Sequence, residues 1–166
     1  MTLLSWQRLT LSLAGLMCLA AGCGSGADGP FDPNAFVDAS DVSAKEAWSV
    51  SSEGLSDPYA AIDGNMATAA QASEGYQEAS LTIDLGELCY FNMIGIAHGA
   101  EEHGYAKVVA VLISRDGRTY TRQKLAPGLR VTTIISLIEP VLARYVRIEV
   151  VRPHWQAWSI AEVQIK

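Results

Sequence analysis

Residues 47–165 consist of short runs in which apolar and polar residues alternate. Leu81, Ile83 and Leu85 share one face of such a run, while Thr82 and Asp84 point to the other. Turns rich in Gly, Asp and Asn separate the runs, and strands at this spacing predict an all-β fold, a two-sheet antiparallel jelly-roll sandwich. The predicted strands are 47–51, 79–84, 90–97, 107–114, 119–124, 131–137, 144–151 and 159–165.

The chain begins with the features of a secretion signal. Arg8 precedes an apolar run of 11 residues (9–19) that contains two hydroxyl residues. A transmembrane helix needs about 20 apolar residues, so this run is typical of a signal peptide. The small residues at 20–22 precede Cys23 and resemble a lipobox, which predicts cleavage before Cys23 and a lipid on this residue. An ordinary signal peptide, cut after an Ala-x-Ala motif, is the alternative.

Two further segments are predicted after this leader (1–23). Residues 24–35 are small, turn-rich and acidic, which is typical of a flexible tether with a short reach. Residues 36–166 are expected to form a single domain, because about 130 residues provide one hydrophobic core and not two.

The net charge narrows the range of partners. The leader holds one basic residue and no acidic residue, so the remaining chain has 11 basic and 18 acidic residues and a net charge of −7. An acidic surface argues against nucleic acid and against electrostatic docking on anionic lipids. Membrane contact is therefore expected through the N-terminal lipid only, in the cell envelope. The outer membrane is favoured because Gly24, and not Asp, follows the cysteine.

Four motifs follow one another in the chain. They are Ala-Ile-Asp-Gly-Asn (61–65) with Thr68, Leu-Thr-Ile-Asp-Leu-Gly (81–86), Ile-Ser-Arg-Asp-Gly (113–117) with Tyr120, and Ala-Arg-Tyr-Val-Arg-Ile (143–148) closed by Glu162. In this order they resemble, from Val42 to Lys166, the discoidin-like or coagulation factor V/VIII (F5/8) type C domain, whose bacterial members include the family 32 carbohydrate-binding modules. This resemblance implies a galactose-binding-like sandwich that mostly binds and seldom catalyses.

The first motif has the composition of a calcium loop. A carboxylate, a hydroxyl and backbone carbonyls within six residues suit a hard cation that takes six to eight oxygen ligands. The alternative is that Asp63 caps a turn and Glu162 pairs with a surface arginine. The family usually has Trp two residues after Thr68, where this chain has Ala70. The resemblance implies one structural Ca²⁺, held by the side chains of Asp63, Thr68 and Glu162 and by the carbonyls of Ala60 and Asn65.

The densest group of polar residues is predicted to lie on the loop between two apolar strands. Sugar recognition needs carboxylate and imidazole groups for the hydroxyls and a flat ring for the C–H face. Trp155 can supply that ring, or it can tuck against the edge of the sandwich. The predicted ligand-binding residues are His98, Glu101, His103 and Tyr105 on this loop, and His154 and Trp155 on a later loop.

Other functions receive less support from the sequence. His98 and His103 as zinc ligands match no metalloprotease helix, although a loop can bring them together. The chain has no Gly-x-Ser-x-Gly elbow, no Cys-x-x-Cys pair and no phosphate-binding loop. The sequence thus predicts a surface-tethered, non-catalytic module that binds carbohydrate. A protein-binding adhesion or assembly module that uses the same loops is the alternative, and an enzyme ranks third.

The lipid anchor leads to a first prediction. Replacing the acylated residue, Cys23→Ser, should move the protein from the membrane fraction to the soluble fraction, because each buried acyl CH₂ contributes about 0.8 kcal/mol to membrane binding. Fractionation of cells that express either form, followed by immunoblotting, measures this change. A variant that remains with the membranes as the wild type does would contradict the lipoprotein interpretation.

Overall fold

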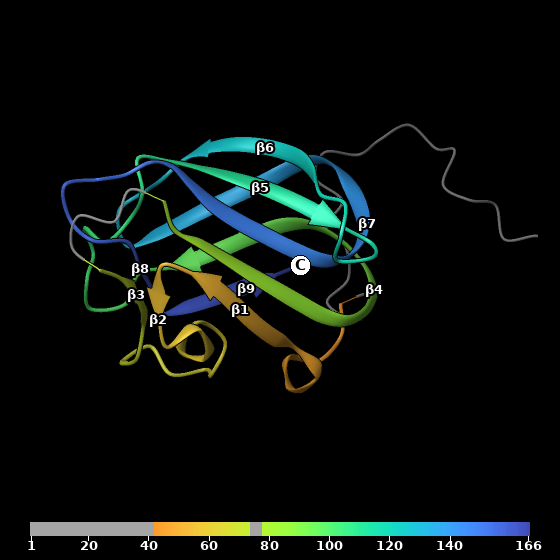
Figure 1. The fold of residues 1–166 in the computed structure, drawn as a ribbon, viewed down its shortest axis with the longest axis horizontal. Coiled ribbons are helices and arrows are strands. Elements are labelled where there is room, and N and C mark those ends of the chain that lie inside the picture. Colours follow the sequence, from red (N-terminus) through yellow and green to blue (C-terminus); the bar gives the residue numbers. More distant parts are fainter. Residues whose placement is uncertain (1–41, 74–77) are drawn as a thin grey trace, which may run out of the picture. The chain divides into compact units, whose positions relative to one another are not determined.

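The computed structural model describes residues 42–73 and 78–166 (Figure 1). The predicted leader, the predicted lipidation site Cys23 and the predicted tether lie outside these residues. No helix in the described ranges is long and apolar enough to cross a membrane. In chain order the elements are η2 (Lys45–Ala47), β1 (Ser49–Glu53), β2 (Leu55–Ser56), η3 (Pro58–Ala61), β3 (Ala70–Ala72), β4 (Ser80–Ala97), β5 (Val108–Ser114), β6 (Thr121–Pro127), β7 (Thr132–Arg152), β8 (Ser159–Ile160) and β9 (Glu162–Ile165).

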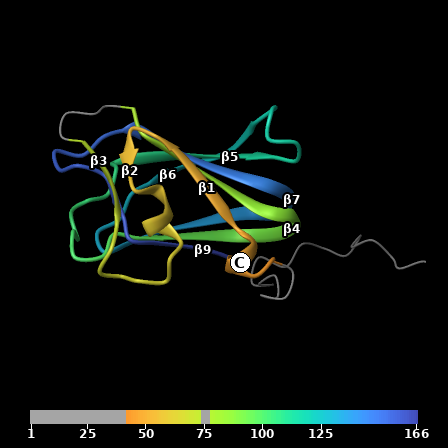
Figure 2. The same cartoon turned by 60° about the horizontal axis from the view of Figure 1, so that its bottom comes forward.

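The larger sheet is built around β4 and β7, two long antiparallel strands that pair along most of their length. The strand order is β1-β4-β7-β5-β6, and β9 pairs with the last part of β4. Both strands bend near the middle and turn back, on the right in Figures 1 and 2. Each strand therefore contributes one half to each layer, and the predicted all-β, two-sheet sandwich is confirmed.

The strand boundaries differ from the prediction at these bends. The predicted strands 79–84 and 90–97 are joined in β4, and 131–137 and 144–151 are joined in β7. Register shifts mark the bend of β4, where Gly86 has a φ of 82° and donates its N–H to Asp84. Such irregular pairs bend a strand without ending it, so residues that read as turns in the sequence remain within the sheet.

A second, three-stranded sheet of order β2-β3-β8 was not predicted from the sequence. The single strand predicted at 159–165 is divided at Ala161 into β8 and β9. These two strands have different partners, since β8 pairs with β3 and β9 pairs with β4, both antiparallel. The small sheet, together with η3, lies near the strand ends of the larger sheet, on the left in Figure 1.

The core lies between the two layers and is formed by alternate residues of the long strands. Leu81, Ile83 and Leu85 of β4 are fully buried, as predicted, and so are Val146 and Ile148 of β7. Burial of apolar surface stabilises a fold by roughly 25 cal/mol per Å². This packing gives the loops at the strand ends a rigid base.

Three loops leave the same end of the sandwich. Residues 98–107 connect β4 to β5, residues 128–131 precede β7, and residues 153–158 follow β7. Ala97 pairs with Thr132 and Val108 pairs with Arg152, so all three loops begin next to one another. This arrangement brings together polar residues that are up to about a third of the chain apart.

Candidate functional site

Aromatic and imidazole rings gather where the loops 98–107 and 153–158 meet. We call His103, Tyr105, His154 and Trp155 the aromatic cluster. The ring centroids of Tyr105 and His154 are 4.5 Å apart, those of His154 and Trp155 are 5.2 Å apart, and those of His103 and Trp155 are 6.1 Å apart. The rings of His103 and His154 are nearly parallel, with an interplanar angle of 8°. The fold therefore brings four of the six predicted ligand-binding residues into one group of rings.

Trp155 is, like His103, an exposed member of this cluster, with 77% of its surface accessible to solvent. The sequence left open whether this ring tucks against the sandwich edge, and the structure places it in solvent. A large apolar ring that remains exposed is typical of a contact surface. Its flat face can pack against the C–H face of a sugar, while the imidazoles beside it bond to hydroxyl groups.

A close backbone approach holds the two loops in place. The Ser159 N–H donates a hydrogen bond of 2.7 Å to the Gly104 carbonyl. A Cβ atom at position 104 would lie 2.7 Å from the Cβ of Ser159, which is too short for any side chain. Glycine is therefore required next to His103, and the position of this imidazole depends on that contact.

His98 lies beneath the aromatic cluster, with its ring centroid 6.2 Å from that of Tyr105, and its burial counts against the ligand contact predicted for this residue. Its side chain is 1% exposed. Its Nδ1 lies 2.7 Å from the Ser159 carbonyl and its Nε2 lies 3.0 Å from the Thr133 hydroxyl. The carbonyl can only accept, so Nδ1 carries the proton and, in the neutral ring, Nε2 accepts the hydrogen of Thr133. With both nitrogens bonded, His98 links the end of β4 to β7 and β8 beneath the loops.

The two carboxylates of the same loop have different surroundings. Glu101 accepts a hydrogen bond from Gln156, which is the neighbour of Trp155. Glu102 forms an ion pair of 2.5 Å with Arg130 on the loop 128–131. Glu101 thus lies at the rim of the aromatic cluster, whereas Glu102 fastens its loop to the adjacent one.

The protonation state of His154 suits a role in hydrogen bonding. Partial burial of the ring, together with repulsion from Lys107 and His103, lowers the pKa of His154 below its ordinary value of 6.5. The neutral imidazole therefore predominates at neutral pH. A neutral ring offers one donor and one acceptor, which is the combination that a sugar hydroxyl needs.

The predicted calcium loop folds around its own carboxylate. Asp63 accepts the hydroxyl hydrogen of Thr68 at 2.7 Å and the N–H of Asn65 at 2.8 Å. These hydrogen bonds, that from Thr68 first, lower the pKa of Asp63, so its carboxylate is ionised at neutral pH. The Asn65 carbonyl accepts the Thr68 N–H at 3.1 Å and lies 2.8 Å from the Thr68 hydroxyl oxygen, and Ala60 is buried in η3. Asp63 thus caps the turn at 63–68, as the alternative interpretation of this motif predicted.

Glu162, the last predicted calcium ligand, is 6% exposed at the start of β9. One of its carboxylate oxygens pairs with Lys45, where the alternative interpretation expected a surface arginine. The other oxygen, Oε2, has no hydrogen-bond partner within the described residues. A buried oxygen without a partner, an ionised Asp63 and a hydroxyl provide the hard ligands that calcium prefers, so these residues fit the ion. Lys45 adds a positive charge that the sequence did not predict.

The zinc alternative finds no support in the arrangement of the residues. Over residues 42–73 and 78–166, no three or more His, Cys, Asp or Glu side chains lie close enough together to hold a metal ion. His98 is buried with both nitrogens bonded, and His103 is exposed on the loop. The two imidazoles are therefore not joint ligands.

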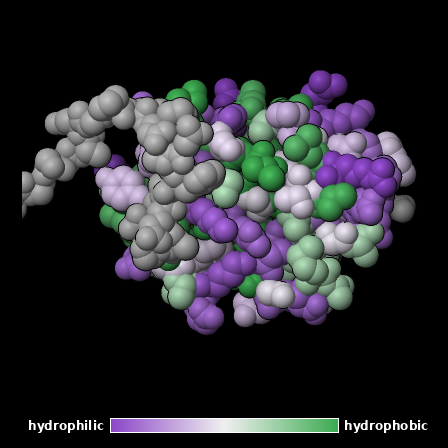
Figure 3. All heavy atoms as spheres, turned by 180° about the vertical axis from the view of Figure 1, so that it is seen from behind, coloured by the Kyte–Doolittle hydropathy of each residue, from purple (hydrophilic) through white to green (hydrophobic). Residues whose placement is uncertain are grey.

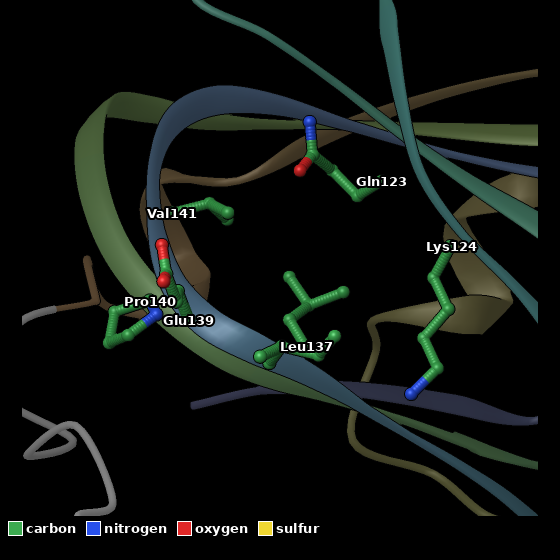
Figure 4. A pocket seen from close by; sticks show the side chains of 7 residues that line it. Gln123, Lys124, Leu137, Glu139, Pro140 and Val141 are labelled. Atoms are coloured by element: carbon green, nitrogen blue, oxygen red, sulfur yellow. The ribbon is translucent and has the colours of Figure 1, made fainter. Parts of the chain in front are cut away.

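A cavity elsewhere on the domain is less suited to a sugar. It has a volume of about 430 Å³ and lies between β6 and the bend of β7, where it is lined by Gln123 and Lys124 from β6 and by residues 137–141 from β7 (Figure 4). No aromatic ring lines it. On the face seen in Figure 3, apolar and polar side chains intermingle over the part that is not covered in grey. The aromatic cluster remains the site with the best chemistry for a sugar.

Several residues that shape these sites were missed in the sequence. Lys45 lies in a segment with weak patterning, 117 positions before its partner Glu162. Thr133, on β7, bonds to His98, and Arg130, on the loop 128–131, pairs with Glu102. Val131, between them, has a φ of 68°, which is rare for a β-branched residue, and its carbonyl accepts the His98 N–H. No local motif marks these contacts, because each joins residues that are far apart in the sequence and meet only in the folded structure.

Comparison with known proteins gives one family match. Residues 41–163 match the model of the F5/8 type C domain. This region includes most of the sandwich, the aromatic cluster and the predicted calcium loop. A comparison with curated proteins found no significant match.

Solved structures with the same fold include three bacterial sugar-binding modules. The family 32 module of NanJ from Clostridium perfringens, in complex with galactose, is 18% identical and has a TM-score of 0.66, with 73% of this chain and 94% of that chain covered. A family 32 module of C. perfringens GH89, in complex with GalNAc-β-1,3-galactose, is 14% identical (TM-score 0.66; 73% and 96% covered). Chitosan-binding module 1 of a Paenibacillus sp. IK-5 chitosanase/glucanase is 20% identical (TM-score 0.62; 71% and 93% covered). At these identities the similarity establishes the fold.

The buried His98 leads to a prediction on pH. Burial lowers the pKa of His98 below its ordinary value of 6.5, so below that pH the unfolded chain binds a proton that the folded chain resists. Stability should therefore be full above about pH 6.5 and should decrease as the pH falls toward the lowered value. Melting curves from pH 7.5 to about 5 would show the melting temperature decreasing, and His98→Gln should reduce this decrease. Equal pH dependence in both proteins would contradict the assignment.

Proposed function

Because the chain belongs to the F5/8 type C domain family, we propose that it is a non-catalytic module that binds carbohydrate through the aromatic cluster. The resemblance that the sequence motifs indicated is confirmed by this family match. The observation that supports the sugar site best is the Trp155 ring, which is 77% exposed beside two imidazoles. An aromatic face with adjacent donors and acceptors is the combination that a pyranose requires.

The proposed ligand is one sugar residue of the galactose or amino-sugar type on an external polysaccharide. The sugar packs on Trp155, while His103, His154 and Glu101 bond to its hydroxyl or amino groups. Modules of the same fold bind galactose, GalNAc-galactose and chitosan, which supports this class of ligand. One stacked ring and three or four hydrogen bonds suggest a dissociation constant near 1 mM, or about −4 kcal/mol.

Such weak binding suits a protein that is tethered in many copies. We propose that the domain is attached through Cys23 to the outer membrane of the cell envelope and faces outward. Tethering converts later binding events into local ones, so avidity exceeds the affinity of a single site. The same arrangement would serve to hold polysaccharide close to the cell.

The calcium loop has a separate, structural role in this proposal. Asp63, Thr68 and Glu162 would hold one Ca²⁺, with carbonyl oxygens of Ala60 and Asn65. Bound there, the ion would offset the charge of the two carboxylates and join the loop after η3 to β9. The support for this role is the partnerless buried oxygen of Glu162 and the ionised carboxylate of Asp63.

Removal of the ring tests the sugar site. Trp155→Ala and His103→Ala should each weaken binding at least tenfold in a calorimetric titration with a glycan identified on an array, because stacking and a hydrogen bond are lost. Tyr59→Ala is a matched control, since Tyr59 is 63% exposed on η3, outside the aromatic cluster. If both cluster variants bind as the wild type does while remaining folded, the site lies elsewhere and a protein-binding role becomes the better interpretation.

Chelation tests the calcium site. EDTA should lower the melting temperature of the wild type by several degrees relative to a calcium buffer, because a ligand at a hundredfold excess over its Kd stabilises the fold by about 2.7 kcal/mol. The variant Asp63→Ala should lose this difference. Differential scanning calorimetry measures both effects, and a wild-type curve that is indifferent to EDTA and to calcium would overturn the proposed ion.

A further inference from the structure

Lys45 provides a positive charge at the buried carboxylate of Glu162. Its Nζ atom pairs with Oε1 of Glu162, and the exposed fraction of the lysine side chain is only 34%. A buried carboxylate is costly unless a cation or several donors neutralise it. Lys45 therefore does, from within the chain, part of what a bound metal ion would do.

The lysine is held in this position by its own surroundings. Lys45 opens the short helix η2, and its Nζ lies 5.6 Å from the centre of the Trp48 ring. Trp48 is buried, and its indole N–H donates to the Ser43 carbonyl at 3.0 Å. A cation over an aromatic face is stabilised by the ring. The Trp48 ring thus also stabilises the ammonium in its position near Glu162.

The calcium loop lies next to this pair. The space above Gly99 is closed by the Cβ of Ala161, the residue before Glu162, and by the carbonyl of Met66 from the loop 63–68. The charge of Lys45 also acts on Asp63, as the weakest of the influences on its pKa, after the hydrogen bonds from Thr68 and Asn65. The positive charge of Lys45 would therefore repel a divalent ion that is shared by Asp63 and Glu162.

We propose that Lys45 is a built-in competitor of calcium, whose ammonium neutralises Glu162 when the ion is absent and weakens calcium binding when the ion is present. This inference rests on the calcium site proposed above. To bind, Ca²⁺ must either displace the ammonium from Glu162 or accept a like charge beside it, and both lower its affinity. The domain therefore keeps its fold at low calcium, and Lys45 sets the concentration at which the ion binds.

Removal of this charge provides the test. Calcium titrations of the domain by isothermal calorimetry should give a Kd at least about tenfold lower for Lys45→Met than for the wild type, because the repulsion is lost. Melting curves should also change, with a lower melting temperature in EDTA and a larger increase on adding CaCl₂. Lys45→Arg keeps the charge and should bind calcium as the wild type does. Lys124→Met, which removes a lysine from β6, is the control for net charge.

The outcomes separate this inference from the calcium site itself. If Lys45→Met binds calcium with the wild-type Kd, the competition is overturned and the ion remains. If neither protein binds calcium, both proposals fail. If Lys45→Met does not fold in EDTA, Lys45→Gln and refolding at increasing CaCl₂ replace the titration. The inference predicts that the variant refolds at a lower CaCl₂ concentration than the one that stabilises the wild type. A variant that needs the same or a higher concentration would overturn the inference.

Discussion

The pairing of β4 with β7 is the constraint on which the rest of the molecule depends. Both strands bend and return, and their antiparallel register continues into both layers. Their inward residues therefore form the core, while their outer ends meet at one end of the sandwich. The loops 98–107 and 128–131 are adjacent because of this register, and the pairing of β5 with β7 brings the loop 153–158 beside them. A binding surface made of residues that are distant in the chain follows directly from that register.

The loops have been made rigid by buried polar contacts beneath the surface. His98 links three strands through its two ring nitrogens, and Gly104 allows β8 to lie against the loop that presents His103. Rings that are held in place lose little entropy when a ligand binds. The site thus combines a rigid base with an exposed indole. Two ion pairs outside the aromatic cluster, Glu102–Arg130 and Lys45–Glu162, neutralise nearby carboxylates.

The sequence was sufficient for the fold class, because alternation of apolar residues directly reports which face of a strand is buried. It was not sufficient for the two long strands, since the bends near Gly86 and Pro140 have the composition of ordinary loops. His98 and His103 look equivalent in the sequence, yet Thr133 and Ser159 bury the first and leave the second exposed. The partner of Glu162 likewise depends on a contact across 117 positions. Local patterns predict elements and residue types, whereas burial and pairing depend on the tertiary structure.

The central claim is that the indole of Trp155 packs on a sugar, and indole N–H signals in NMR spectra test it most directly. Among the described residues the tryptophans are Trp48, Trp155 and Trp158, and only Trp155 is exposed. A titration with the glycan selected on an array should shift the Trp155 signal in proportion to saturation and leave the signals of Trp48 and Trp158 in place. An unchanged Trp155 signal at saturating glycan, or shifts confined to residues around the cavity at Gln123 and Val141, would contradict the account.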